Sequence, residues 1–250
     1  MNTFLLMLQL FTKVPIRKEV PFDRRKFSRG VVFFPLIGLV IGIMVSLPTY
    51  AAERYFGREV SAVIMIFSAA AVTGGLHLDG LADTMDGILS ARSRDKMLLI
   101  MKDSRIGTHG VLALIFTIFV KYQFLIKVES SLFMLMVIVL PVAGRTAISV
   151  MLLGSRYARE DGLGNLFIGR TEDIESVASG ILGMLITFAF LGLNGIAALG
   201  ITLVLTALFR LRLDKILGGL TGDTLGALNE MAELTYIPIY ILIERGVNLL

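Results

Sequence analysis

Cysteine is absent from the 250-residue sequence, and histidine occurs only twice. The lack of cysteine excludes disulfides, thiolate metal sites and cysteine nucleophiles. Charge is also scarce: Asp, Glu, Lys and Arg make up 18% of the residues, whereas 55% are hydrophobic and the mean hydropathy is +0.79. A chain this apolar does not suit a soluble globular domain, so the composition indicates an integral membrane protein.

The N-terminal segment lacks the residue order of a cleaved signal peptide, because its apolar run precedes its basic residues. The net charge of +4 is carried by Lys and Arg residues that cluster in short loops. We interpret these residues as orientation signals and not as a nucleic-acid-binding surface, and we expect no nucleic-acid partner.

Apolar runs long enough to cross a bilayer core of about 30 Å recur along the chain. They predict an all-α fold, a polytopic transmembrane helix bundle that forms one integral-membrane domain over residues 1–250. We expect about seven spans, at 31–50, 58–75, 108–126, 132–153, two halves of 177–209 separated by the turn signal at 192–195, and 235–250.

The distribution of Lys and Arg predicts the orientation of these spans. The N-terminus is expected on the cytoplasmic side, because basic residues crowd the segment before the first span: Lys13, Arg17, Lys18, Arg24, Arg25, Lys26 and Arg29. The basic segments 77–106 and 154–173 fall on the same side. Two acidic stretches, 74–87 and 218–234, then also face the cytoplasm. We expect them to form short amphipathic helices that converge on one site.

The first acidic stretch, "GGLHLDGLADTMDG", places Asp79, Asp83 and Asp86 at positions i, i+4 and i+7. On a helix these carboxylates lie within about 60° of one another, and their charges repel unless cations compensate. Oxygen ligands without a His–Cys set favour Mg²⁺ or Mn²⁺. Because Mg²⁺ commonly combines one or two carboxylates with substrate phosphates, the spacing suggests a diphosphate substrate. The alternative is a solvated amphipathic helix, but no basic residue lies between 77 and 91.

Other polar residues are candidates for contact with substrate. Lys102, Asp103 and Arg105 lie in "KDSRIGTHG", where cations could hold phosphate oxygens, although a positive-inside flank has the same composition. Arg145 and Lys121 fall inside expected spans, where a charge normally faces the bundle interior. They could pair with the acidic cluster or contact phosphate, and His77 beside Asp79 is a further candidate.

At these motifs the sequence resembles the cobalamin synthases, the adenosylcobinamide-GDP ribazoletransferase family. The resemblance runs nearly end to end. It rests on "LQLFTKVP", "GGLHLDGLADTMDG", "KDSRIGTHG", the "YAREDGLG" loop and "TGDTLGA", which follow one another in the family's order.

The resemblance implies a Mg²⁺-dependent transfer of adenosylcobinamide phosphate from adenosylcobinamide-GDP to α-ribazole or its 5′-phosphate, with release of GMP. It also implies an integral protein of the bacterial cytoplasmic membrane. Together with the orientation expected from Lys and Arg, this makes the chain a multi-pass protein with its active site on the cytoplasmic side. Other copies of the chain, or other enzymes of the pathway, are possible partners. In this reading Asp86, Lys102 and Arg105 are catalytic, with Asp86 as general base. Substrate contacts come from Lys102, Asp103, Arg105, Arg159, Arg145 and His77. The expected metal ligands are Asp79, Asp83, Asp86, Asp223 and Glu233.

Three other functions compete with this reading. CDP-alcohol phosphotransferases and aromatic prenyltransferases are also membrane transferases with aspartate-rich metal sites. The first class carries Arg at the position of Asp83, and the second requires a stronger second aspartate motif than "GDTLGA". A cation transporter would place its acids near mid-bilayer, whereas these acids are expected at the cytoplasmic ends of spans.

Overall fold

The structure is a computed structural model of the chain that describes residues 2–16, 23 and 27–247. Within that part the chain is all-helical apart from short connections, and it has no named strand. Five basic residues used to orient the chain, Arg17, Lys18, Arg24, Arg25 and Lys26, lie outside the described residues, as does the end of the seventh expected span.

The helices follow the apolar runs of the sequence. In order they are α1 (Asn2–Phe11), the 3₁₀ turn η1 (Arg29–Phe33), α3 (Phe34–Phe56), α4 (Arg58–Thr73), α5 (Leu76–Ile88), α6 (Arg94–Ile100), α7 (Thr108–Leu125), α8 (Phe133–Met151), the 3₁₀ turn η2 (Leu163–Leu166), α9 (Asp173–Leu217) and α10 (Gly222–Val247).

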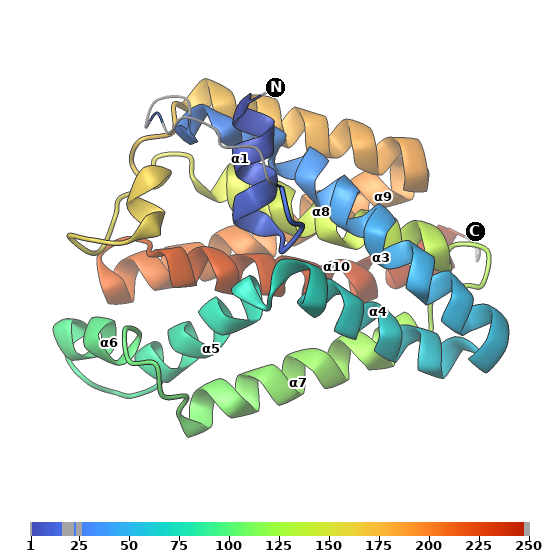
Figure 1. Ribbon diagram of the computed structural model, residues 1–250, viewed down its shortest axis with the longest axis horizontal. Coiled ribbons are helices and arrows are strands. Elements are labelled where there is room, and N and C mark those ends of the chain that lie inside the picture. Colours follow the sequence, from blue (N-terminus) through green and yellow to red (C-terminus); the bar gives the residue numbers. More distant parts are fainter. Residues whose placement is uncertain (1, 17–22, 24–26, 248–250) are drawn as a thin grey trace.

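Helices α8 and α10 form the centre of the bundle. Helix α8 packs between α3 and α9, while α10 packs against α5, α8 and α9 (Figure 1). Close approach of α3 to α8 depends on Gly38, because a Cβ atom there would lie 2.5 Å from the carbonyl oxygen of Pro141. Small residues at helix crossings let backbones meet closely in membrane bundles, so this contact supports the expected architecture.

Several helices have the length and composition of membrane spans. Four pass by themselves: the helical stretch Arg29–Phe56, α7, α8 and α9. Helices α4 and α5 pass only as a pair bent by 90°, which makes up to five. Helix α9 is one of these four candidate spans, although its 45 residues include a non-helical residue, Gly192, with φ 60° and ψ −153°. Figure 1 shows the chain reversing direction within α9, as the expected turn at 192–195 requires.

The C-terminal acidic stretch differs from the sequence-based expectation. Residues 223–234 were expected to form a separate short helix before a span at 235–250, but residues 223–234 and 235–247 belong to the continuous helix α10. The prediction of two elements was wrong because nothing between these residues ends a helix. Pro238 lies inside α10 without terminating it. The count of seven spans remains a prediction.

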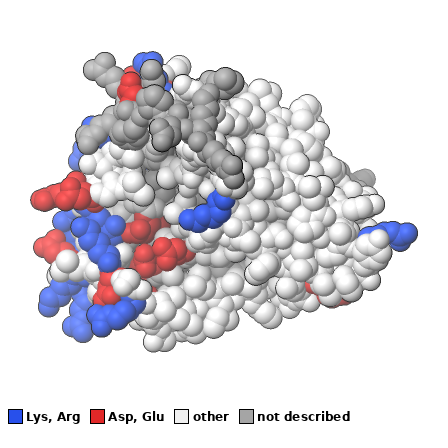
Figure 2. All heavy atoms as spheres, in the orientation of Figure 1, with Lys and Arg blue, Asp and Glu red and all other residues white. Residues whose placement is uncertain are grey.

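Charged side chains gather at one end of the molecule. Figure 2 shows Lys, Arg, Asp and Glu concentrated on the side where Figure 1 places α6 and the start of α10, while most of the visible remainder is uncharged. This distribution separates a polar end from an apolar body. Helix α5, which is too short to span a membrane by itself, carries its aspartates toward the polar end.

Candidate functional site

Two glycines aim α5 away from α4. Gly74 and Gly75 both adopt left-handed backbone conformations, with φ of 66° and 71°, a region that side-chain-bearing residues rarely enter. Gly74 ends α4 and Gly75 precedes the first residue of α5. The resulting 90° bend takes the chain from an apolar helix into the acidic one.

Two further glycines bring α5 against the start of α10. A Cβ atom on Gly80 would lie 2.7 Å from the backbone carbonyl oxygen of Asp223, and one on Gly226 would lie 3.1 Å from that of His77. The two helices therefore cross in near backbone contact. This crossing brings Asp79 and Asp223 to one cavity of about 240 Å³, although they are 144 positions apart in the sequence.

The carboxylates at this crossing are crowded. Burial, together with the charges of Asp223 and Asp79, raises the pKa of Asp83 to about 7. Burial also raises the pKa of Asp223, although Arg159 opposes the rise by pairing with it at 2.7 Å. The site therefore holds more negative charge than its single neighbouring guanidinium offsets, which is the electrostatic condition that favours a bound cation.

The carboxylates at this crossing are suited to holding a magnesium ion together with phosphate oxygens. Within the described residues, no three His, Asp or Glu side chains are grouped closely enough to hold a metal ion by themselves. Mg²⁺ does not require three, because phosphate oxygens and water complete its coordination when one or two carboxylates hold it. Asp79, Asp83 and Asp223 supply carboxylate oxygens of this kind at the polar end of the bundle.

Asp86 has other partners. Its side chain is buried, and its two oxygens accept hydrogen bonds from the backbone amides of Gly107, at 2.7 Å, and Gly110, at 2.8 Å. These amides belong to the start of α7, so Asp86 caps that helix from α5. A role as general base or metal ligand would compete with both hydrogen bonds.

The segment before α7 places its charges at the surface. Asp103 and Arg105 form an exposed ion pair at 2.7 Å, and the hydrogen bond from Arg105 lowers the pKa of Asp103 to about 2. Lys102 is exposed and lines an open cavity of about 580 Å³. Of these three candidate substrate contacts, the structure brings Lys102 to the same cavity as Arg159.

The loop 157–164 lies between the two cavities. Its first residues pair with the segment before α10, because the amide of Ala158 donates to Leu220 at 2.8 Å and the amide of Leu220 donates to Arg156 at 2.8 Å. Tyr157 and Arg159 line both the 240 Å³ and the 580 Å³ cavities. Arg159 therefore lies at the boundary between an open, charged cavity and a more apolar one, and Asp79 and Asp223 line the second of these.

Sequence reasoning missed two residues here. Arg94 lines the open cavity and donates hydrogen bonds to the carbonyls of Leu217, at 2.7 Å, and Ala158, at 2.9 Å. It therefore ties α6 to the loop and to the end of α9. Tyr157 was quoted only as part of a motif. An Arg in a basic loop and a Tyr before a glycine-rich turn carry no distinguishing signal in one sequence.

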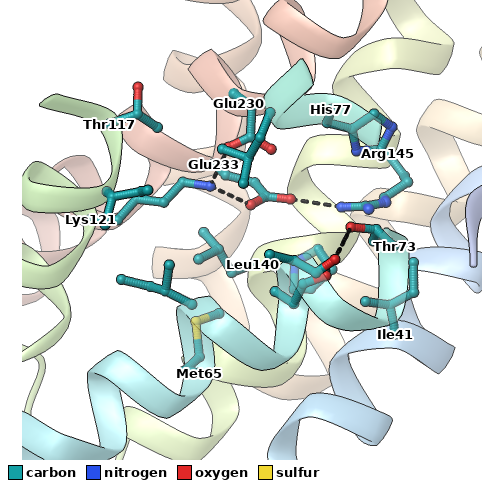
Figure 3. Close-up of a pocket in the computed structure, with 16 residues that line it drawn as sticks. Ile41, Met65, Thr73, His77, Thr117, Lys121, Leu140, Arg145, Glu230 and Glu233 are labelled. Carbon is teal, nitrogen blue, oxygen red and sulfur yellow. Dashed lines mark hydrogen bonds and ion pairs between the residues drawn. The ribbon is translucent and has the colours of Figure 1, made fainter. Parts of the chain in front are cut away.

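A second charged cluster is buried in the bundle, apart from the aspartates (Figure 3). Lys121 of α7 pairs with Glu230 and Glu233 of α10, each at 2.7 Å, and Arg145 of α8 pairs with Glu233 at 2.7 Å. Asn229 also donates to Glu233. Both oxygens of Glu233 are thus engaged, and Arg145 faces this cluster. Glu233 is therefore not assigned to the metal site, and Arg145 is not assigned to the phosphate site.

His77 lies between the two regions. Its side chain is 5% exposed, and its Nε2 atom has no hydrogen-bond partner within the described residues. It lines both the 240 Å³ cavity beside the aspartates and a small cavity of about 40 Å³ beside the buried cluster. A buried polar nitrogen without a partner calls for an explanation, such as a ligand or an ordered water molecule.

The chain is similar to known proteins over nearly its whole length. The family model described as cobalamin-5-phosphate synthase matches residues 3–241. A protein of Clostridium botulinum (strain Okra / Type B1) named adenosylcobinamide-GDP ribazoletransferase is 40% identical, covering 97% of this chain and 98% of its own. A protein of the same name from Escherichia coli O17:K52:H18 is 40% identical over 94% of this chain and 97% of its own. No solved structure matches the chain.

Proposed function

The chain belongs to the cobalamin-5-phosphate synthase family, and we propose that it transfers adenosylcobinamide phosphate from adenosylcobinamide-GDP to α-ribazole or its 5′-phosphate, releasing GMP. The observation that carries the proposal is the position of Asp79, Asp83 and Asp223. Asp79 and Asp223 line the more apolar cavity, and Asp83 is close enough to both for their charges to raise its pKa. Arg159, which also lines the open cavity, pairs with Asp223 at 2.7 Å. A donor diphosphate and an acceptor nucleoside need such neighbouring sites.

The open cavity suits the donor. Its 580 Å³ are lined by three basic residues, Arg94, Lys102 and Arg159, and by three acidic ones, Asp95, Glu160 and Asp161. The three cations can hold diphosphate oxygens. Its wide opening leaves the bulky cobinamide and guanosine groups room to extend outside. Mg²⁺ held by carboxylates of Asp79, Asp83 and Asp223 would neutralise charge on the diphosphate and on the leaving GMP.

The reaction is a displacement at phosphorus. A ribose hydroxyl oxygen of the acceptor forms a bond to the phosphorus on the cobinamide side, and the bond from that phosphorus to the bridging oxygen breaks. GMP leaves with the electron pair. The hydroxyl proton passes to a carboxylate of the aspartate cluster or through water. Asp86 is less suited to this step than expected from the sequence, because it would have to give up the Gly107 or Gly110 amide.

The proposal also places the protein in the bacterial cytoplasmic membrane, with the polar end toward the cytoplasm. Support comes from the apolar body and from the collection of basic side chains at the end that holds the aspartates. This orientation gives the site access to a nucleotide-linked donor that is made inside the cell.

One assay separates the proposal from its rivals. Purified protein in liposomes is mixed with adenosylcobinamide-GDP, α-ribazole and Mg²⁺, and GMP release is followed. We expect release that requires all three additions. A CDP-alcohol phosphotransferase would instead release CMP from a CDP-alcohol, and a cation transporter would show ion flux without nucleotide release. Absence of GMP with both substrates present would exclude the proposed transfer.

A further inference from the structure

The cavity of about 240 Å³ beside the aspartates has an aromatic wall. Its lining includes the rings of Phe11, Phe34, His77, Tyr157 and Phe167, which come from α1, α3, α5 and the loop between α8 and α9. The ring centroids of Phe11 and Phe34 are 4.8 Å apart, and those of Phe34 and Phe167 are 5.4 Å apart, both edge to face. Aromatic walls of this kind favour a flat apolar ligand.

The same cavity also has charged residues in its lining. Asp79, Asp223 and Arg159 line it together with the rings. A ligand that fills the cavity therefore places an apolar part against the phenyl rings and a polar part against the carboxylates. An acyl chain would leave the charged side unused, and a diphosphate would leave the aromatic side unused.

The volume limits the occupant. Pockets that enclose a whole drug-sized ligand start at roughly 300 Å³. A cavity of about 240 Å³ therefore holds one ring system with its immediate substituents. It is too small for the cobinamide macrocycle.

We propose that this cavity binds the aromatic base of the acceptor nucleoside, a dimethylbenzimidazole in α-ribazole, and directs its ribose toward Asp79 and Asp223. This inference rests on the proposed function. His77 contributes selectivity. Its Nε2 is buried without a partner among the described residues. In the tautomer with the proton on Nε2, this atom donates a hydrogen bond to the ring nitrogen of the base that is not attached to ribose. Satisfying a buried donor in this way discriminates strongly between bases that have an acceptor there and bases that do not.

A filling substitution tests the location. Leu225 of α10 lines the cavity and is 8% exposed, whereas Leu228 of the same helix is buried but does not line it. We expect Leu225→Phe to raise the KM for α-ribazole about tenfold or more, with the KM for adenosylcobinamide-GDP changed less than about twofold. The increase in KM should be smaller for the α-riboside of imidazole, whose base is smaller. Leu228→Phe, the matched control, should not raise the KM for α-ribazole more than the KM for adenosylcobinamide-GDP.

A second variant tests the hydrogen bond and does not depend on how Leu225→Phe folds. The wild-type protein should prefer the benzimidazole riboside over the indole riboside, which has C–H in place of the acceptor nitrogen, by at least about tenfold in kcat/KM. His77→Leu should abolish that preference, and His77→Gln, which keeps an N–H donor, should retain part of it.

The outcomes distinguish the two proposals. If the wild-type protein releases no GMP from adenosylcobinamide-GDP and α-ribazole, the proposed function fails. If the wild-type protein does release GMP, two results would overturn the assignment of this cavity to the acceptor base. One is that Leu225→Phe raises both KM values equally. The other is that His77→Leu discriminates against the indole riboside as the wild type does.

Discussion

The guanidinium of Arg159 and the carboxylate of Asp223 form an ion pair at 2.7 Å, with Arg159 about nine-tenths buried and Asp223 about three-quarters buried. The pair joins the 157–164 loop to the first turn of α10 across the boundary of the two cavities. Arg159 is thus the one cation that both touches the acidic cluster and lines the proposed donor cavity, within the part of the chain that the structure describes.

Replacing Arg159 should impair the reaction. We expect Arg159→Ala to lower kcat/KM for adenosylcobinamide-GDP by about a hundredfold, because a preorganised cation next to the diphosphate is lost. Arg156→Ala is the matched control, since Arg156 is exposed directly before this loop and lines neither cavity. GMP release under saturating Mg²⁺ measures both. Equal activity in the two variants would contradict a phosphate contact by Arg159.

Removing a cluster carboxylate should raise the requirement for magnesium. Asp83→Asn keeps the side-chain shape but removes a charge from the crowded site, so we expect a Mg²⁺ concentration for half-maximal activity at least about tenfold higher, with a lower maximal rate. Asp173→Asn, an exposed acid at the start of α9, is the control. EDTA should abolish wild-type activity and Mg²⁺ should restore it. Full activity of Asp83→Asn at low Mg²⁺ would make the metal assignment untenable.

The raised pKa of Asp83 predicts a pH dependence. A carboxyl group with a pKa of about 7 takes up a proton as the pH falls through that value, and the proton competes with a cation for the same oxygens. Apparent Mg²⁺ affinity should therefore increase from pH 6 to pH 8 and then level off. Asp83→Asn should show a flatter profile, and an unchanged profile in that variant would place the titrating group elsewhere.

Much of the helical architecture could be predicted from the sequence. The spans at 108–126 and 132–153 agree with α7 and α8 within a residue or two, because long apolar runs bounded by polar loops depend on local composition. The break near Gly192 was also signalled locally. By contrast, the start of α10 was assigned to a separate helix, because acids in a membrane protein were taken to mark a segment outside the span.

The site itself was only partly predictable. The spacing of Asp79 and Asp83 pointed to a shared helix face, and the resemblance of motifs added Asp223. The partners of Asp86, Lys121 and Arg145 depend on contacts across 21 to 112 positions of sequence, which no local pattern encodes. A single sequence shows that a charge inside a span needs a partner, but it does not show which one.

Asp86 should behave as a helix cap. Asp86→Asn keeps one carbonyl oxygen for the amides of Gly107 and Gly110 and loses the other, so we expect a loss of about 1 kcal/mol in stability. The thermal unfolding temperature of the protein in detergent should fall, while the Mg²⁺ concentration for half-maximal activity stays close to that of the wild type. A stable variant with a strongly raised Mg²⁺ requirement would instead restore Asp86 to the metal site.

The buried cluster should be a structural element whose charges must balance. Lys121→Met leaves Glu230 and Glu233 with Arg145 as their remaining cation, and an uncompensated buried charge typically costs about 3–5 kcal/mol. We therefore expect a large fall in thermal stability. The double variant Lys121→Met/Glu230→Gln removes one charge of each sign and should recover a substantial part of the loss. The thermal stability of both variants is measured in the same detergent. If the double variant is no more stable than Lys121→Met, charge balance is not what Lys121 provides to the bundle.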